Sequence, residues 1–168
     1  MSRRSCVVLL CGACHALLSL TAAAAEPSRQ DEVRSKGAEV MPFSLDETRH
    51  VFDKNDAGGV QRVLARGGSA GQRDMIRSHL REIALSFDAR NFDKPTHIHG
   101  ADMPGLAELK AAGKDELEVI YSDLPDGAQI IYRSASPRIV AAVHRWFDAQ
   151  LSDHGRDATT SDSPHPAP

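Results

Sequence analysis

The chain has 168 residues, a length that suits one folded domain with additional terminal segments. It carries 20 basic and 23 acidic residues, for a net charge of −3, and the two signs are mixed along the sequence. This balance gives no basic surface for nucleic acid or for a membrane, so we expect neither as a partner. The three cysteines, Cys6, Cys11 and Cys14, lie near the N-terminus. The rest of the chain therefore has no disulfide, thiolate metal site or cysteine nucleophile.

Residues 1–25 have the three parts of a cleavable secretory signal. Arg3 and Arg4 form the positive end, an apolar stretch follows through Leu20, and small residues run up to Ala25. The pattern predicts cleavage after Ala25 and a periplasmic or secreted protein. An uncleaved membrane anchor is the alternative, but the apolar stretch is short for a membrane span. The first residues also partly resemble a twin-arginine signal, so the general and the twin-arginine export routes both stay open.

The composition separates one folded region from its flanks. Residues 26–40 are polar and show no periodicity, which predicts a flexible linker. Residues 156–168 are rich in Asp, Thr, Ser and Pro and hold no large apolar side chain, which predicts a disordered tail. We therefore expect a single domain over residues 41–155.

Two stretches of this domain share the pattern of a strand, a tight turn that contains glycine, and a second strand. They are residues 50–64 and 118–132, and they align without a gap, so that Gly59 matches Gly127. Each stretch predicts a β-hairpin. The shared pattern favours an internal repeat, with chance similarity between two common units as the alternative.

An amphipathic helix is expected after each hairpin. Apolar residues recur at helical spacing in both places, as Ile76, Leu80, Ile83 and Phe87 and as Val140, Val143, Phe147 and Leu151. Ser136 and Pro137 suit the start of the second helix, and a short helix is expected over residues 104–112. These elements predict an α+β fold. Its two ββα units form a four-stranded, mostly antiparallel sheet with the helices on one face, plus the short connecting helix.

The histidines carry most of the functional information in this sequence. His79 and His144 lie on the two apolar stripes, and the repeat alignment, with a three-residue gap, brings them to equivalent positions. Each is followed about one helical turn later by a carboxylate, Glu82 or Asp148, which could fix the tautomer of the imidazole. We expect the two imidazoles to face one shared space under the sheet. Two core histidines, each bonded to a backbone carbonyl, are the alternative.

Another pair, His97 and His99, flanks Ile98 in a stretch that we expect to be extended. Residues i and i+2 of an extended segment point to the same side. An H-x-H pair therefore often presents two imidazoles to one Zn²⁺ or Cu²⁺ ion. His50, at the start of the first strand, and His154, at the end of the last helix, are further candidates.

Seven segments of the chain resemble a family of small bacterial proteins, some of which carry the name aspartate carbamoyltransferase. The segments are residues 41–43, 48–52, 58–61, 76–80, 98–105, 124–128 and 146–155. The resemblance places five histidines on the family pattern: His50, His79, His99, His144 and His154. His97 is not on it and is therefore the weakest candidate ligand. The Ser-Thr-Arg-Thr motif of true aspartate carbamoyltransferases is absent from the sequence, which argues against that activity.

The sequence thus favours an exported domain that binds a transition metal, Zn²⁺ or Cu²⁺, or a small molecule through that metal. The predicted ligands are His79, His144 and His99, followed by His50 and His154, with Glu82 and Asp148 in support. One alternative is a metal-dependent enzyme in which the metal activates water and Glu82 or Asp148 is the general base. Another is an interaction module whose histidines are structural. The sequence does not define the metal, the substrate or the oligomeric state.

Overall fold

The computed structural model describes residues 26–162. The elements follow in the order α1 (Arg29–Val40), β1 (Thr48–Asn55), β2 (Gly58–Ala65), α2 (Ala70–Asp88), α3 (Asp93–His99), α4 (Leu106–Lys110), β3 (Glu118–Leu124), β4 (Gly127–Arg133), α5 (Pro137–His154) and β5 (Ala158–Thr159). Short 3₁₀ turns precede α2 and β5. None of these helices is long and apolar enough to cross a membrane. The fold is α+β, as predicted.

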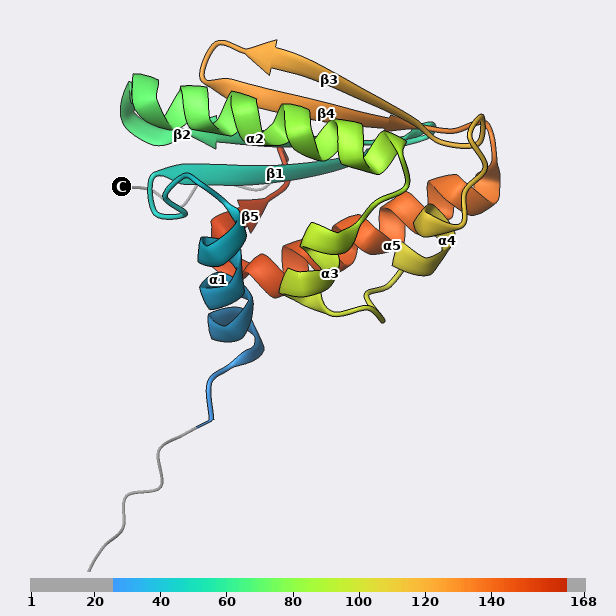
Figure 1. Ribbon diagram of the computed structural model, residues 1–168, viewed down its shortest axis with the longest axis horizontal. Coiled ribbons are helices and arrows are strands. Elements are labelled where there is room, and N and C mark those ends of the chain that lie inside the picture. The colour runs from blue at the N-terminus through green and yellow to red at the C-terminus, as the bar shows by residue number, and fades with distance from the viewer. Residues whose placement is uncertain (1–25, 163–168) are drawn as a thin grey trace, which may run out of the picture.

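The sheet has five strands in the order β3-β4-β2-β1-β5 (Figure 1). Both predicted hairpins are present, and their second strands, β2 and β4, lie side by side and antiparallel at the centre. This is the order that a pseudo-two-fold axis between β2 and β4 would produce. The fifth strand was not predicted. It pairs parallel to β1, where His50 is opposite Ala158, so the sheet is mixed.

Helices α2 and α5 each cross over to the hairpin of the other unit. Helix α2 packs on β4 and β3, and α5 packs on β2 and β1. Because strand side chains alternate between faces, Phe52, Val63 and Ile130 share one face, and they form a single core with both helices. The helices thus cover one face of the sheet, as expected (Figure 1).

Two glycines allow main chains to approach closely in this core. A Cβ atom on Gly127 would lie 2.0 Å from the carbonyl oxygen of Val63 on the neighbouring strand. A Cβ atom on Gly105, which has a φ of +81°, would lie 2.2 Å from the carbonyl oxygen of Ala142 on α5. The loop before α4 can therefore rest directly on α5 because it carries no side chain at that point.

The segment predicted to be a flexible linker, residues 26–40, is a helix over most of its length. Helix α1 starts with a capping box, in which Ser28 and Asp31 exchange hydrogen bonds. It has little amphipathic pattern and buries only Val33 and Gly37. Instead, its polar side chains bind distant parts of the chain, for example Arg34, which pairs with Asp46 and Asp157. The linker prediction was wrong because ion pairs, and not an apolar stripe, hold this helix in place, and a partner such as Asp157 is 123 residues away in the sequence.

The predicted disordered tail is ordered at its start. Residues Gly155–Asp157 form a 3₁₀ turn and Ala158–Thr159 form β5. Ser161 then bonds to the Asp53 carboxylate through its backbone N–H and its hydroxyl. The domain therefore extends past residue 155. Residues 163–168 of the predicted tail, and the predicted signal peptide over residues 1–25, lie outside the described residues.

Candidate functional site

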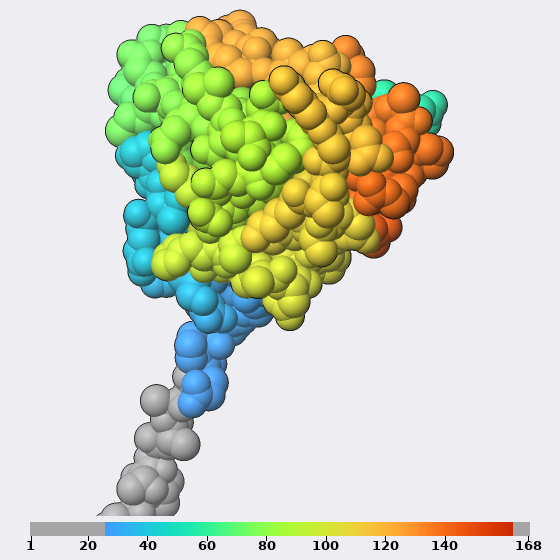
Figure 2. Space-filling view, turned by 45° about the vertical axis from the view of Figure 1, so that its right-hand side comes forward, coloured from blue at the N-terminus to red at the C-terminus, as the bar shows by residue number. Residues whose placement is uncertain are grey.

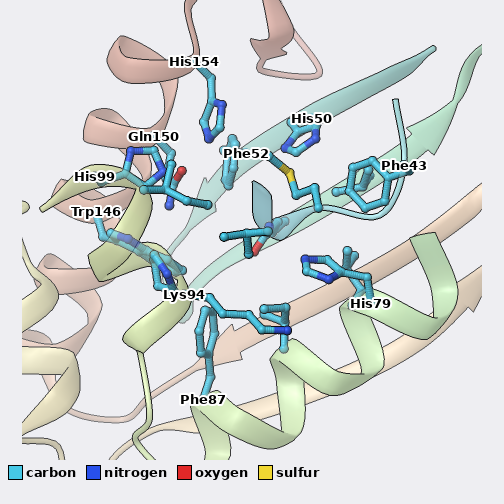
Figure 3. Close-up of a pocket in the computed structure, with 18 residues that line it drawn as sticks. Phe43, His50, Phe52, His79, Phe87, Lys94, His99, Trp146, Gln150 and His154 are labelled. Carbon is cyan, nitrogen blue, oxygen red and sulfur yellow. The ribbon is translucent and has the colours of Figure 1, made fainter. Parts of the chain in front are cut away.

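A cavity with a volume of about 60 Å³ lies between the sheet, α2, α3 and α5 (Figure 3). Four histidines line it: His50 from β1, His79 from α2, His99 from the end of α3, and His154 from the end of α5. All four are at least nine-tenths buried. The other polar lining residues are Gln61, Lys94, Trp146 and Gln150, and aromatic and aliphatic side chains complete the wall.

Three of the imidazoles form a cluster at one end of this cavity. The ring centroids of His154 and His99 are 5.0 Å apart, and those of His154 and His50 are 5.4 Å apart. His79 lies at the other end, and the Phe43 ring contacts both His50 and His79, with centroid distances of 6.0 and 5.6 Å (Figure 3). We call His50, His99 and His154 the histidine cluster.

The orientation of His99 is fixed by an ion pair outside the cavity. Its Nδ1 lies 2.8 Å from Oδ2 of Asp153, and Arg29 on α1 donates two hydrogen bonds to the same carboxylate and one to the His99 carbonyl. A carboxylate only accepts hydrogen bonds, so Nδ1 of His99 carries the proton and Nε2 keeps its lone pair. Figure 2 shows the chain near Arg29 (blue) at the end of the molecule formed by α3 and its loop (yellow-green).

Burial keeps the four imidazoles neutral. It lowers the pKa of His50 to about 4, and the neighbouring His79 and His99 add to this effect. Burial, together with the charge of Lys94, lowers the pKa of His79 to about 4. Burial also places the pKa of His154 well below its usual value, and it lowers that of His99 despite the opposing bond to Asp153. At neutral pH, each ring therefore has one nitrogen with a free lone pair.

Two buried nitrogens at the cavity wall have no hydrogen-bond partner among the described residues. They are Nε2 of His50 and Nε1 of Trp146. A buried polar atom without a partner costs about 1–3 kcal/mol, and such atoms are uncommon in folded proteins. A ligand or water in the cavity would satisfy them.

The structure separates several residues that the sequence grouped together. His144 is half-buried on α5, lies outside the cavity and binds the Asn55 carbonyl at 3.0 Å, so it does not share a space with His79. Glu82 pairs with Lys94 and Asp148 with Lys54, each at the surface. Neither lines the cavity, so the expected support of His79 and His144 by these carboxylates is not present.

The predicted H-x-H pair is also not formed, because residues 93–99 are helical rather than extended. Two residues apart on a helix, the imidazoles point in different directions. His99 is buried, whereas His97 is exposed and lies 3.1 Å from the Glu39 carboxylate. Sequence reasoning missed the roles of Asp153 and Arg29. The only signal for Asp153 was its place beside His154, and no local pattern pointed to Arg29.

As they stand, no three histidine, cysteine, aspartate or glutamate side chains within residues 26–162 are arranged so that they could hold a metal ion.

The chain was also compared with protein-family models, curated protein sequences and solved structures, and none of these comparisons found a match. The candidate site therefore rests on the geometry of this molecule alone.

Proposed function

We propose that the protein binds a transition-metal ion, Zn²⁺ or Cu²⁺, through the histidine cluster. The observation that carries this proposal is the spacing of the rings, 5.0 Å from His154 to His99 and 5.4 Å to His50. Two imidazoles that share a tetrahedral ion have centroids about 5 Å apart, because each metal–nitrogen bond is about 2 Å long. Of the three ligands that the sequence ranked first, the proposed site keeps His99. His50 and His154 replace His79 and His144.

The chemistry of the cluster supports the same conclusion. Metal ligands must be neutral imidazoles, and burial holds the pKa of His50 at about 4. Histidine ligands commonly donate their second N–H to a carboxylate, which orients the ring and increases its basicity. The bond between His99 and Asp153 is of this kind. In addition, Nε2 of His50 is buried without a hydrogen-bond partner among the described residues, and a metal ion would supply one.

Binding requires the rings to turn about their side-chain bonds, because three donor atoms do not yet meet at one point. A second cleft, of about 370 Å³, shares His99 with the cavity and is lined by Arg29, Asp102 and Asp153. Arg29 pairs with the Asp153 carboxylate, so the Asp102 carboxylate is the charge that could attract a cation there. The cleft offers an approach to His99 from the surface.

Calorimetric titration of the purified protein with Zn²⁺ and Cu²⁺ tests the proposal. We expect one ion per chain, with micromolar or tighter affinity. Because Trp146 is the only tryptophan and lines the cavity, Cu²⁺ should also quench its fluorescence. His99→Ala should weaken binding about 100-fold or more. His144→Ala, at a position outside the cavity, is the control and should bind as the wild type does.

The supporting carboxylate gives a second variant for the same titration. Asp153→Asn should weaken metal binding about 10- to 100-fold, since it removes the charge that orients His99. Asp148→Asn is the matched control, because Asp148 pairs with Lys54 away from the cavity. Absence of binding to the wild type at micromolar metal would refute the proposal and leave the histidines with a structural role.

We also propose that the protein is exported, so that the site works in the periplasm or outside the cell. The proposal is supported by the positive, apolar and small-residue segments that end at Ala25. Mass spectrometry of the protein from its native host should find a chain that starts at Glu26. A bulk product that retains Met1 would contradict export.

A further inference from the structure

Helix α1 forms part of the wall of the histidine-lined cavity. It packs against α3 and α5 (Figure 1). Its last residue, Val40, lines the cavity together with Met41, the residue that follows. Helix α3 carries His99 and α5 carries His154. Helix α1 therefore lies against the end of the cavity that holds the histidine cluster.

Arg29 attaches the first turn of α1 to the segments that carry two histidines of the cluster. It donates a hydrogen bond of 2.7 Å to the carbonyl oxygen of His99. It also donates to the carboxylate of Asp153 at 2.6 Å, and Asp153 directly precedes His154 in the chain. The same carboxylate lies 2.8 Å from Nδ1 of His99. A single arginine thus joins α1 to both segments.

Arg34, further along α1, attaches the helix to the segment beside the third histidine of the cluster. It pairs with the carboxylates of Asp157 and Asp46. Asp157 directly precedes Ala158, which is opposite His50 in the sheet. The attachment points of α1 therefore lie beside all three histidines, and a movement of the helix away from them would uncover this end of the cavity.

Little apolar contact supplements these ion pairs. Of the 12 residues of α1, Val33 and Gly37 are buried, so Val33 is the one large apolar side chain that the helix buries. The two arginine side chains are partly exposed, Arg29 by 45% and Arg34 by 29%. Ion pairs in contact with solvent are weak and are screened by salt. A helix of this length is marginal in water by itself, so α1 depends on its attachment to remain folded.

We infer that α1 is a detachable cover of the histidine cavity, held by the ion pairs of Arg29 and Arg34, and that it opens while the rest of the domain stays folded. Segments with few buried apolar contacts are the first to open locally. The backbone of Met41 is extended, and it is the point at which the cover turns away from the domain. Ionic strength would set how often the cavity opens. The inference concerns access to the cavity and does not depend on the proposed metal.

Chemical labelling of the histidines measures the opening. Diethyl pyrocarbonate acylates a neutral imidazole that it can reach, and mass spectrometry of the peptides gives a rate for each histidine of the metal-free protein. Because His50, His99 and His154 are at least nine-tenths buried, we expect slow labelling of all three at about 0.1 M NaCl. Labelling should be about tenfold faster at about 1 M NaCl, where the screening length falls from about 10 Å to about 3 Å.

Two variants and a matched control identify the ion pairs as the cause. Arg29→Ala and Arg34→Ala should each speed the labelling of the cluster about tenfold at low salt, since each removes charge-assisted hydrogen bonds. Lys36→Ala is the control. Lys36 lies on the same helix and carries the same charge, but it pairs with Glu32 of α1 itself. Its loss leaves the attachment of α1 in place, so labelling should match that of the wild type.

Hydrogen exchange of α2 shows whether the domain stays folded in these experiments, and its amides should keep their protection throughout. Equal labelling of the cluster at low and high salt, and in the variants and the wild type, would mean that α1 is a fixed part of the wall. Loss of protection in α2, or an equal acceleration at His144 outside the cavity, would show that the whole domain loosens. Either result refutes the cover. Lys36→Ala labelled as fast as Arg34→Ala would refute the role of the two arginine pairs.

Discussion

Lowering the pH from about 6.5 to about 4 is expected to remove several kcal/mol from the free energy of unfolding. In the folded protein, burial lowers the pKa of both His50 and His79 to about 4. In the unfolded chain each titrates near 6.5. Between these values the unfolded state binds more protons, so acid favours it. The stabilisation is complete above about pH 6.5, declines as the pH falls, and is lost near pH 4.

Each of these two histidines should contribute about 1.4 kcal/mol per pH unit inside this window, or roughly 3 kcal/mol over its full width. Their sum is comparable to the whole stability of a small domain. His99 and His154 act in the same direction, because burial lowers the pKa of both. Most carboxylates titrate below about pH 4.5, so the upper part of the window isolates the histidines.

Urea unfolding at about pH 7, 6 and 5 measures the effect as a shift of the midpoint. His79→Gln should make the pH dependence less steep by about 1.4 kcal/mol per unit, whatever its effect on stability at neutral pH. His144→Gln, at a half-buried position outside the cavity, is the matched control. A free energy of unfolding that stays constant between pH 7 and 5 would mean that the buried histidines are already protonated or are solvated.

Replacing Arg90 with alanine is expected to lower the free energy of unfolding by about 3 kcal/mol. Arg90 follows α2. Its guanidinium group donates hydrogen bonds to backbone carbonyls of two segments, the end of α2 and the loop that leads to β3. The acceptors are Phe87, Asp88, Ala112, Gly113, Lys114 and Leu117. One side chain thus joins the end of α2 to the loop between α4 and β3. Without it, several carbonyls lose a charged donor.

The backbone conformation of Arg90 allows the contribution of its side-chain hydrogen bonds to be separated from the cost of backbone strain. Its φ is +61°, a left-handed conformation that a residue other than glycine adopts at a cost of about 1–2 kcal/mol. Arg90→Gly should therefore be less destabilised than Arg90→Ala by about 1 kcal/mol. Arg73→Ala is the control, because within residues 26–162 the Arg73 side chain pairs with the adjacent Asp74 alone, and it should change stability by less than about 0.5 kcal/mol. If Arg90→Ala is as stable as this control, the carbonyls are satisfied by water instead.

The sequence by itself determined the regular elements of the two ββα units. Alternating apolar residues and glycine turns have a local physical cause, so both hairpins, β1–β2 and β3–β4, could be predicted. The apolar stripe of α2 was correct as well. His79, which lies on it, is buried in the cavity as expected. The local pattern was sufficient where the buried face of a helix or strand is the face marked by the spacing of its own apolar residues.

The stripe on α5 shows where such reasoning fails. Two members of the predicted stripe, Val143 and Phe147, are buried, whereas Val140 and Leu151 are only half-buried. The buried residues of the helix are Ile139, Ala142, Val143, Trp146, Phe147, Gln150 and His154. At 100° per residue this face is turned by about 60° from the predicted stripe. That rotation turns His144 away from the cavity and brings His154 into it. Half of the residues of this helix are apolar and they lie on more than one side of it, so only packing against β2 and β1 selects the buried side.

The site itself was decided by the tertiary structure. His50, His99 and His154 are separated by more than 40 residues at each step, and they meet because α5 crosses the sheet and ends beside β1. The pairing of Arg29 with Asp153 spans 124 residues, and it makes a helix of a segment that has almost no apolar pattern. Ion pairs between distant residues leave no periodicity in the sequence, because their partners are set by the path of the folded chain and not by neighbours along it.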